Sequence, residues 1–176
     1  MKRLLLRLSR FVALAMLFST FLGLAQAAPA PSPEVVKGLA WLQAQVQAAG
    51  TLTDEATSIA TPLQSRSETL QTLKLLATVP DALADQLSAD SEDNTEYLAR
   101  RAVTLSLAGR DASAITALLA ARQNLDGGFG GTIGYESNAL DTAWVMLAMA
   151  QNSLSASTEA QTARNYLMVA IQPDGG

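Results

Sequence analysis

The side chains of this chain that could do chemistry are carboxylates, because the residue types that most often carry catalysis are missing. The 176 residues contain no Cys and no His. Their absence excludes disulfides, thiolate or imidazole zinc sites and His-dependent triads from this stretch of sequence. The acids of interest are Asp126 and Asp174, which lie in two copies of a glycine-rich turn, and Asp141, at the start of an expected helix. We expect no metal ion and no cofactor.

The glycine-rich turn occurs twice, and its two Asp residues are 48 positions apart. Glycine adopts the positive φ that ends a helix, and an Asp carboxylate accepts hydrogen bonds from backbone N–H groups across a bend. A carboxylate bonded in this way makes a poor acid. We therefore interpret the turn as structural, with its aromatic residue packed between neighbouring helix hairpins. The turn residues are Gln123, Asp126, Gly127, Gly128 and Phe129 in the first copy and Gln172, Asp174 and Gly175 in the second.

Asp141 is the best single candidate for a catalytic group, but a structural role competes with it. An acid in the first turn of a helix meets free backbone N–H groups and the positive end of the helix dipole, so capping is favoured. Trp41 and Trp144 present a similar choice. Aromatic rings that line a cavity can stabilise carbocations, whereas a lone Trp on an apolar helical face usually belongs to the core. We favour the core for both.

The elements that position these residues are all expected to be helices. Gly50 is expected to stop the first of them in the left-handed conformation. No segment alternates with period two, so we expect no strand. The 48-residue repeat indicates stacked helix hairpins, none of which can bury its apolar face alone. Two of the expected helices begin at Pro33 and Pro62. The others cover about 81–87, 95–108, 113–123, 138–150 and 157–171.

Apolar spacing also predicts which side of each helix is buried. In the segment 113–123, Leu118 and Leu119 are expected to face inward. In the segment 138–150, the inward side is expected to carry Leu140, Trp144 and Leu147.

Helices with Trp and Leu that end in Gln and lead into an Asp-Gly-Gly-aromatic turn resemble the prenyltransferase and squalene-oxidase repeats of the α/α-toroid superfamily. That superfamily includes terpenoid cyclases, protein prenyltransferase β-subunits and the thioester domains of α2-macroglobulin and complement-type proteins. The resemblance runs from about Pro33 to Gly176 and is most specific at Gln123–Gly130 and the following helix. It implies an all-α fold in which antiparallel helix hairpins form part of an α/α toroid, incomplete over 33–176.

The resemblance also implies reactive groups, most of which this chain lacks. Class II cyclases protonate an alkene with an Asp-x-Asp-Asp-Thr-Ala motif, and of the matching stretch Asn138–Ala143 only the final Asp-Thr-Ala remains. The prenyltransferase zinc site needs Cys and His, and the thioester needs Cys. Carbohydrate-active toroids use Tyr, His or paired carboxylates. No paired arrangement is evident for Tyr97, Tyr135 and Tyr166.

The first 27 residues have the features of a secretory signal peptide. Basic residues precede an apolar run from Phe11 to Leu24, and Ala25-Gln26-Ala27 provides a cleavage site. The alternative is a retained membrane anchor, because the apolar run approaches the roughly 17 residues that can span a bilayer. The prolines that follow favour cleavage and an extended mature terminus over 28–32.

Charge and missing reactive groups together decide the expected function. Cleavage would remove four of the 12 Lys and Arg residues and none of the 16 acids, leaving a net charge of about −8. Such a chain is a poor partner for nucleic acid, which is bound largely through Lys and Arg. We expect an exported, non-catalytic toroid scaffold or binding module of a larger periplasmic, secreted or surface protein, with a protein, glycan or apolar ligand as partner. A membrane partner is expected only if the signal is retained.

The alternative is a terpenoid (squalene) cyclase-like enzyme. The sequence stops at Gly176, inside the second turn and before its aromatic residue. We therefore expect a longer natural chain, in whose further part the catalytic acid of a cyclase would lie.

Overall fold

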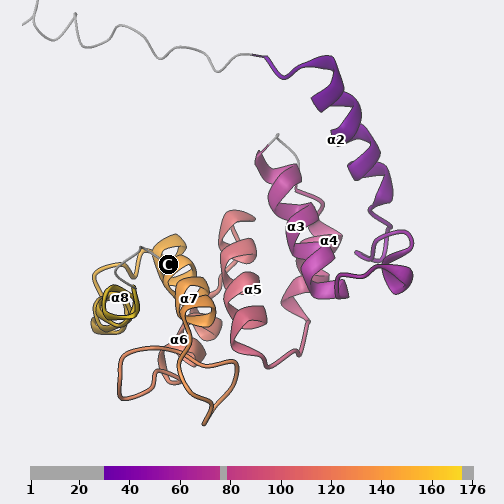
Figure 1. Cartoon of the computed structure of the whole chain (residues 1–176). Helices are drawn as coiled ribbons and strands as arrows, with labels where there is room; N and C mark the ends of the chain where they lie inside the picture. Colours follow the sequence, from indigo (N-terminus) through magenta and orange to yellow (C-terminus); the bar gives the residue numbers. More distant parts are fainter. Residues whose placement is uncertain (1–29, 76–78, 172–176) are drawn as a thin grey trace, which may run out of the picture. The chain divides into compact units, whose positions relative to one another are not determined.

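The computed structural model describes residues 30–75 and 79–171, and over these residues the chain is helical. They form seven α-helices and one short 3-10 helix, with no strand (Figure 1). The predicted all-α class is therefore confirmed. The signal peptide predicted over 1–27 lies outside the described residues, as do Gln172, Asp174 and Gly175 of the second turn.

The chain divides into two units, residues 1–36 and residues 37–176. In the described part of the first unit, Val35 N–H donates a hydrogen bond to Ser32 Oγ at 3.4 Å where α2 begins. The other helices belong to the second unit, to which the following paragraphs refer. In chain order the elements are α2 (Pro33–Gln45), η1 (Glu55–Thr57), α3 (Pro62–Leu75), α4 (Asp81–Ser88), α5 (Thr95–Leu107), α6 (Ser113–Ala120), α7 (Ala139–Gln151) and α8 (Thr158–Ala170).

Polar side chains fix where three of these helices begin. Asn94, Asn138 and Ser157 accept hydrogen bonds from backbone N–H groups in the first turns of α5, α7 and α8. Those N–H groups have no partner inside the helix, so each cap stabilises its helix by about 1 kcal/mol. The three helices begin within one residue of the predicted positions.

Three of the helices from α3 onward form a layer. α5 packs against both α3 and α7, and Figure 1 shows it between them. α4 contacts α3 and α5, α6 contacts α5 and α7, and α8 packs on α7. α3, α5 and α7 therefore form one layer, α4 and α6 each lie against two neighbouring helices of that layer, and α8 packs on α7.

All six of these helices contribute to one hydrophobic core. The contact between α5 and α7 is the most extensive, and both helices bury alanines: Ala99 and Ala102 of α5 and Ala148 of α7 are inaccessible to solvent. Small side chains at a crossing let two helices approach closely. The large side chains that are almost fully buried are Leu63, Leu70, Leu83, Leu87, Leu98, Leu105, Leu119, Phe129, Val145 and Met149.

The side of α7 that packs inward is not the predicted one. Leu140 is 62% exposed and Leu147 is 46% exposed, and of the three only Trp144, which is partly buried, packs against the core. Val145 and Ala148 are fully buried in their place. α7 is apolar on nearly all sides, so periodicity alone cannot choose its buried stripe. The contact with α5 selects the neighbouring stripe, whose side chains are smaller.

The predictions for α2 were also wrong in two respects. The helix ends at Gln45, so Gly50 does not stop it. Gly50 instead has a φ of 77° in the next turn, where an added Cβ would lie 2.0 Å from Ala82 O of α4. Trp41 was expected in the core but is 64% exposed, and no other residue of α2 is buried either.

Candidate functional site

The turn after α6 is held by a side-chain amide that reaches the next hairpin. α6 ends at Ala120, earlier than the predicted Gln123, and Leu118, predicted to face inward, is 48% exposed. Gln123 Nε2 donates to Gly127 O at 2.9 Å and to Glu159 O at 2.8 Å. Because Glu159 lies in the first turn of α8, this amide ties the end of α6 to the beginning of α8.

The carboxylate of Asp126 is used within the same turn. Its Oδ1 accepts hydrogen bonds from Gly128 N–H at 2.9 Å and from Ser137 Oγ at 2.7 Å. The first of these is the backbone bond expected from the sequence. Asn124 Nδ2 donates to Ser137 Oγ at 3.0 Å, so the two ends of the loop are joined through Ser137. The geometry makes Asp126 an acceptor that closes the loop.

Glycine is required in this turn because α8 lies against it. Gly127 has a φ of 85°, and a Cβ there would lie 2.8 Å from Thr162 O of α8. A Cβ on Gly128 would lie 2.6 Å from the Cβ of Ser137 and 2.9 Å from the ring of Tyr166. Any larger residue at either position would push α8 or the loop away.

Phe129 anchors the turn in the core. Its side chain is fully buried, and its backbone is held from both sides. Phe129 N–H donates to Thr142 Oγ1 at 3.0 Å, and Phe129 O accepts from Asn138 N–H at 2.9 Å. The turn is thereby joined to the first residues of α7.

Asp141 lies in the first turn of α7 and forms a reciprocal cap with Asn138. Asp141 N–H donates to Asn138 Oδ1 at 2.9 Å, and Asn138 Nδ2 donates to the carboxylate Oδ2. Asp141 is 7% exposed, and an added Cβ on Gly131 would lie 3.7 Å from its Oδ2 and from Asn94 Nδ2. Asp141 therefore lies where the first turns of α5 and α7 meet. The cap on α7 is made by Asn138, and the Asp141 carboxylate, expected to meet free backbone N–H groups, accepts from the Asn138 side chain instead.

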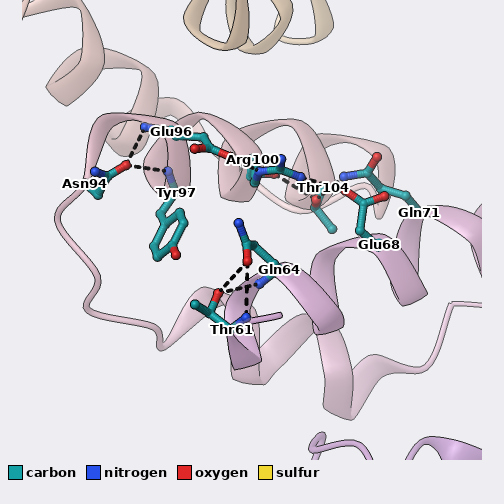
Figure 2. Close-up of polar contacts among 9 residues, drawn as sticks. All are labelled: Thr61, Gln64, Glu68, Gln71, Asn94, Glu96, Tyr97, Arg100 and Thr104. Carbon is teal, nitrogen blue, oxygen red and sulfur yellow. Dashed lines mark hydrogen bonds and ion pairs between the residues drawn. The ribbon is translucent and has the colours of Figure 1, made fainter. Parts of the chain in front are cut away.

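A polar cluster that the sequence analysis did not identify joins α3 to α5. Figure 2 shows Glu68 and Gln71 of α3 opposite Glu96, Arg100 and Thr104 of α5. Arg100 donates to Glu96 from Nε and to Glu68 from Nη1, both at 2.7 Å. Gln71 Nε2 donates to Thr104 Oγ1 at 2.8 Å. The four-residue spacing of Glu96 and Arg100 was a usable signal. The partner on α3 is distant in sequence and gave none.

Trp144 of α7 completes this cluster. The guanidinium carbon of Arg100 lies 4.0 Å from the centroid of the Trp144 ring, within the range of a cation–π interaction. The Arg100 side chain is only 15% exposed, so the contact is largely shielded from water. Because a cation already covers this face of the ring, Trp144 cannot offer the same face to a carbocation.

The outward side of α7 carries exposed apolar residues. Leu140, Ala143 and Leu147 are exposed and spaced three and four residues apart, so they lie along one side of the helix. We call these three residues the α7 stripe. Trp144 lies next to it and is partly buried.

The described residues carry no metal site and no membrane-spanning helix. No group of three or more His, Cys, Asp or Glu side chains in that part of the chain could hold a metal ion. A search of the same residues found no helix with the length and hydrophobicity needed to cross a membrane. Comparison with protein-family models and with curated proteins found no match to the chain.

Proposed function

We propose that this chain is an exported, non-catalytic module of the α/α-toroid type, which binds a protein, glycan or apolar ligand on the layer formed by α3, α5 and α7. The layer of α3, α5 and α7, with α4 and α6 each packed against two neighbouring helices of it, supports the toroid, because successive hairpins of a toroid place one helix inside and one outside. Export rests on the basic and apolar character of residues 1–27.

The α7 stripe is the observation that carries the proposed binding function. Leu140 and Leu147 lie on the outside of a helix whose other side is packed against α5. Contiguous exposed apolar surface on a folded chain often marks an interaction site. In the proposed function the stripe contacts the apolar part of the ligand.

The side chains of Asp126 and Asp141 favour binding over catalysis, because their carboxylate oxygens already accept hydrogen bonds that stabilise the fold. Asp126 accepts two hydrogen bonds that close its loop, and Asp141 accepts one from the residue that caps its helix. Neither is paired with a second carboxylate in the hydrogen bonds it makes.

Binding of anilinonaphthalene sulfonate, a fluorescent probe of apolar surface, tests the stripe. The wild type should bind the probe saturably, and a variant with both Leu140→Ser and Leu147→Ser should lose most of the enhancement. Leu125→Ser is the matched control, because Leu125 is at least as exposed but lies in the turn after α6. Equal probe binding by the double variant and the wild type would count against the stripe.

One observation favours a second function, a terpenoid cyclase-like enzyme. Asp141, the best single candidate for a catalytic group, is almost fully buried at the start of α7. The chain should be incubated with squalene and the products analysed by mass spectrometry. Cyclised product from the wild type but not from Asp141→Asn would replace the binding proposal with the enzymatic one.

A further inference from the structure

A pocket with a volume of about 260 Å³ opens beside Trp41, in the second unit of the chain. Its walls come from the end of α2, from the segment that contains η1, and from α3. Pockets for drug-sized ligands have volumes of roughly 300–1,000 Å³. The pocket beside Trp41 therefore suits a ligand about as large as one six-membered ring with its substituents.

Trp41 is exposed in a way that packing does not explain. Its side chain is 64% accessible, and it is not among the residues that pack against the core. Leu42 and Leu52 give the same pocket an apolar wall. An aromatic face next to aliphatic side chains offers a flat apolar surface, on which a sugar ring can stack through its C–H groups.

The other wall of the pocket carries hydrogen-bonding groups that are not used by the fold. Thr69 is only 6% exposed and lines the pocket, yet its hydroxyl makes no hydrogen bond with any described residue. The hydroxyl of Ser65, one turn earlier on α3, and the carboxylate of Asp54 are likewise without a partner among these residues. A hydroxyl that lines a pocket and has no partner in the protein can form hydrogen bonds with water or with a ligand.

The charged side chains that line the pocket indicate which class of ligand it can bind. Glu55 also lines the pocket, but Arg66 neutralises it through a bond from Nε at 3.0 Å and a second from Nη2. The free charge that remains in the lining is the Asp54 carboxylate. Asp54 has a φ of 59°, a left-handed conformation that Asp tolerates better than most residues. A free carboxylate repels anions and accepts strong hydrogen bonds from neighbouring hydroxyl groups.

From these observations we propose that the pocket binds one neutral pyranose residue, free or at the end of a glycan. The sugar ring stacks on Trp41, and two of its hydroxyl groups donate hydrogen bonds to the Asp54 carboxylate. Other hydroxyl groups of the sugar form hydrogen bonds with Ser65 and Thr69. This site lies apart from the α7 stripe, so the proposal does not depend on the function proposed above.

NMR of the full chain with isotope-labelled tryptophan tests the proposal, because the two indole N–H signals report separately on Trp41 and Trp144. The probes are the methyl glycosides of glucose, galactose and mannose. At least one should shift the Trp41 signal saturably, with a dissociation constant on the order of 1 mM, while the Trp144 signal stays in place. Tighter binding of the disaccharide of that sugar would identify a glycan end as the natural occupant.

Two conservative variants identify the polar contacts. Asp54→Asn keeps the shape and the left-handed tendency of the residue and should weaken binding about tenfold. Thr69→Val keeps the shape of the buried side chain and should weaken binding severalfold. Glu92→Gln, which removes an exposed carboxylate outside the pocket, is the matched control and should bind like the wild type.

Three results would overturn the proposal. The first is the absence of a Trp41 shift with all the glycosides at concentrations up to about 50 mM. The second is an equal shift of both indole signals, which would indicate a solvent effect. The third is unchanged affinity in both Asp54→Asn and Thr69→Val. Trp41→Ala adds an independent check by calorimetry, since an exposed side chain can be removed without disturbing the core.

Discussion

Gly127→Ala should destabilise the fold more than Gly134→Ala, although the two glycines have almost the same backbone conformation. Their φ angles are 85° and 83°. A Cβ on Gly127 would lie 2.8 Å from Thr162 O, whereas a Cβ on Gly134 would have no atom within 4 Å. The pair therefore separates the cost of the left-handed backbone from the cost of contact with α8.

The two costs can be assigned separately. A residue with a Cβ in the left-handed conformation costs roughly 1–2 kcal/mol, so Gly134→Ala should lower the free energy of unfolding by about 1 kcal/mol. At Gly127 the closest atom belongs to the backbone of α8, which can move only with its helix. Overpacking of this kind adds about 1–3 kcal/mol, which brings the expected loss for Gly127→Ala to about 3 kcal/mol.

Urea denaturation followed by circular dichroism measures these losses directly. The free energy of unfolding is obtained by linear extrapolation, and the slope against urea should not change if both variants keep the native fold. The expected order of midpoints is wild type, then Gly134→Ala, then Gly127→Ala. Losses that agree within about 0.5 kcal/mol would refute the reasoning, because the turn would then not be packed against α8.

Three further predictions concern buried charges and a helix cap, all measurable by the same denaturation assay. The Arg122 side chain is 5% exposed and donates both to the Asp93 carboxylate, which is 70% exposed, and to the Asp93 carbonyl. Asp93→Ala leaves the carbonyl bond in place and should cost about 1–2 kcal/mol, and Arg122→Met about 1 kcal/mol or less; a larger loss in Arg122→Met than in Asp93→Ala would contradict this. Hydrogen bonds from Arg66 hold the pKa of Glu55 below its ordinary value. The pair therefore stabilises the fold at pH values above about 4.3, the pKa of Glu in the unfolded chain. This contribution is lost as the pH falls through the lower pKa of Glu55 in the folded chain. Glu55→Gln should therefore cost about 2 kcal/mol near neutral pH and progressively less in acid, and a loss that does not change with pH would exclude the ion pair as its source. Asn138→Ala should cost about 1 kcal/mol through loss of the cap on α7, and a neutral result would show that the cap is not needed.

The sequence predicted the helices best where local chemistry defines their ends. Asn138 and Ser157 satisfy N–H groups within three residues of themselves, so a start signal can be read without knowing the fold. The bond from Gly128 N–H to Asp126 was predictable for the same reason. In each case the donor and the acceptor are neighbours along the chain.

The errors arose where a partner distant in sequence decides the outcome. Leu140 and Leu147 of the α7 stripe were expected inside from apolar spacing, but contact with α5 selects the side that carries Val145 and Ala148. The bond between Arg100 and Glu68 spans 32 positions and joins two helices whose pairing was not known. Trp41 was assigned to the core from its position on an apolar helix, and α2 has no buried residue.

The repeated turn is a poor place to look for a site, for a reason that follows from its contacts. Gln123 bonds the first turn of α8, Gly127 lies against Thr162, and Asp126 is used inside the loop. Each of these groups therefore either closes the turn or packs it against the next hairpin. A ligand must instead contact side chains that this packing leaves free. In the described part of the chain, the α7 stripe and the pocket beside Trp41 meet that condition, and neither includes a residue of the turn.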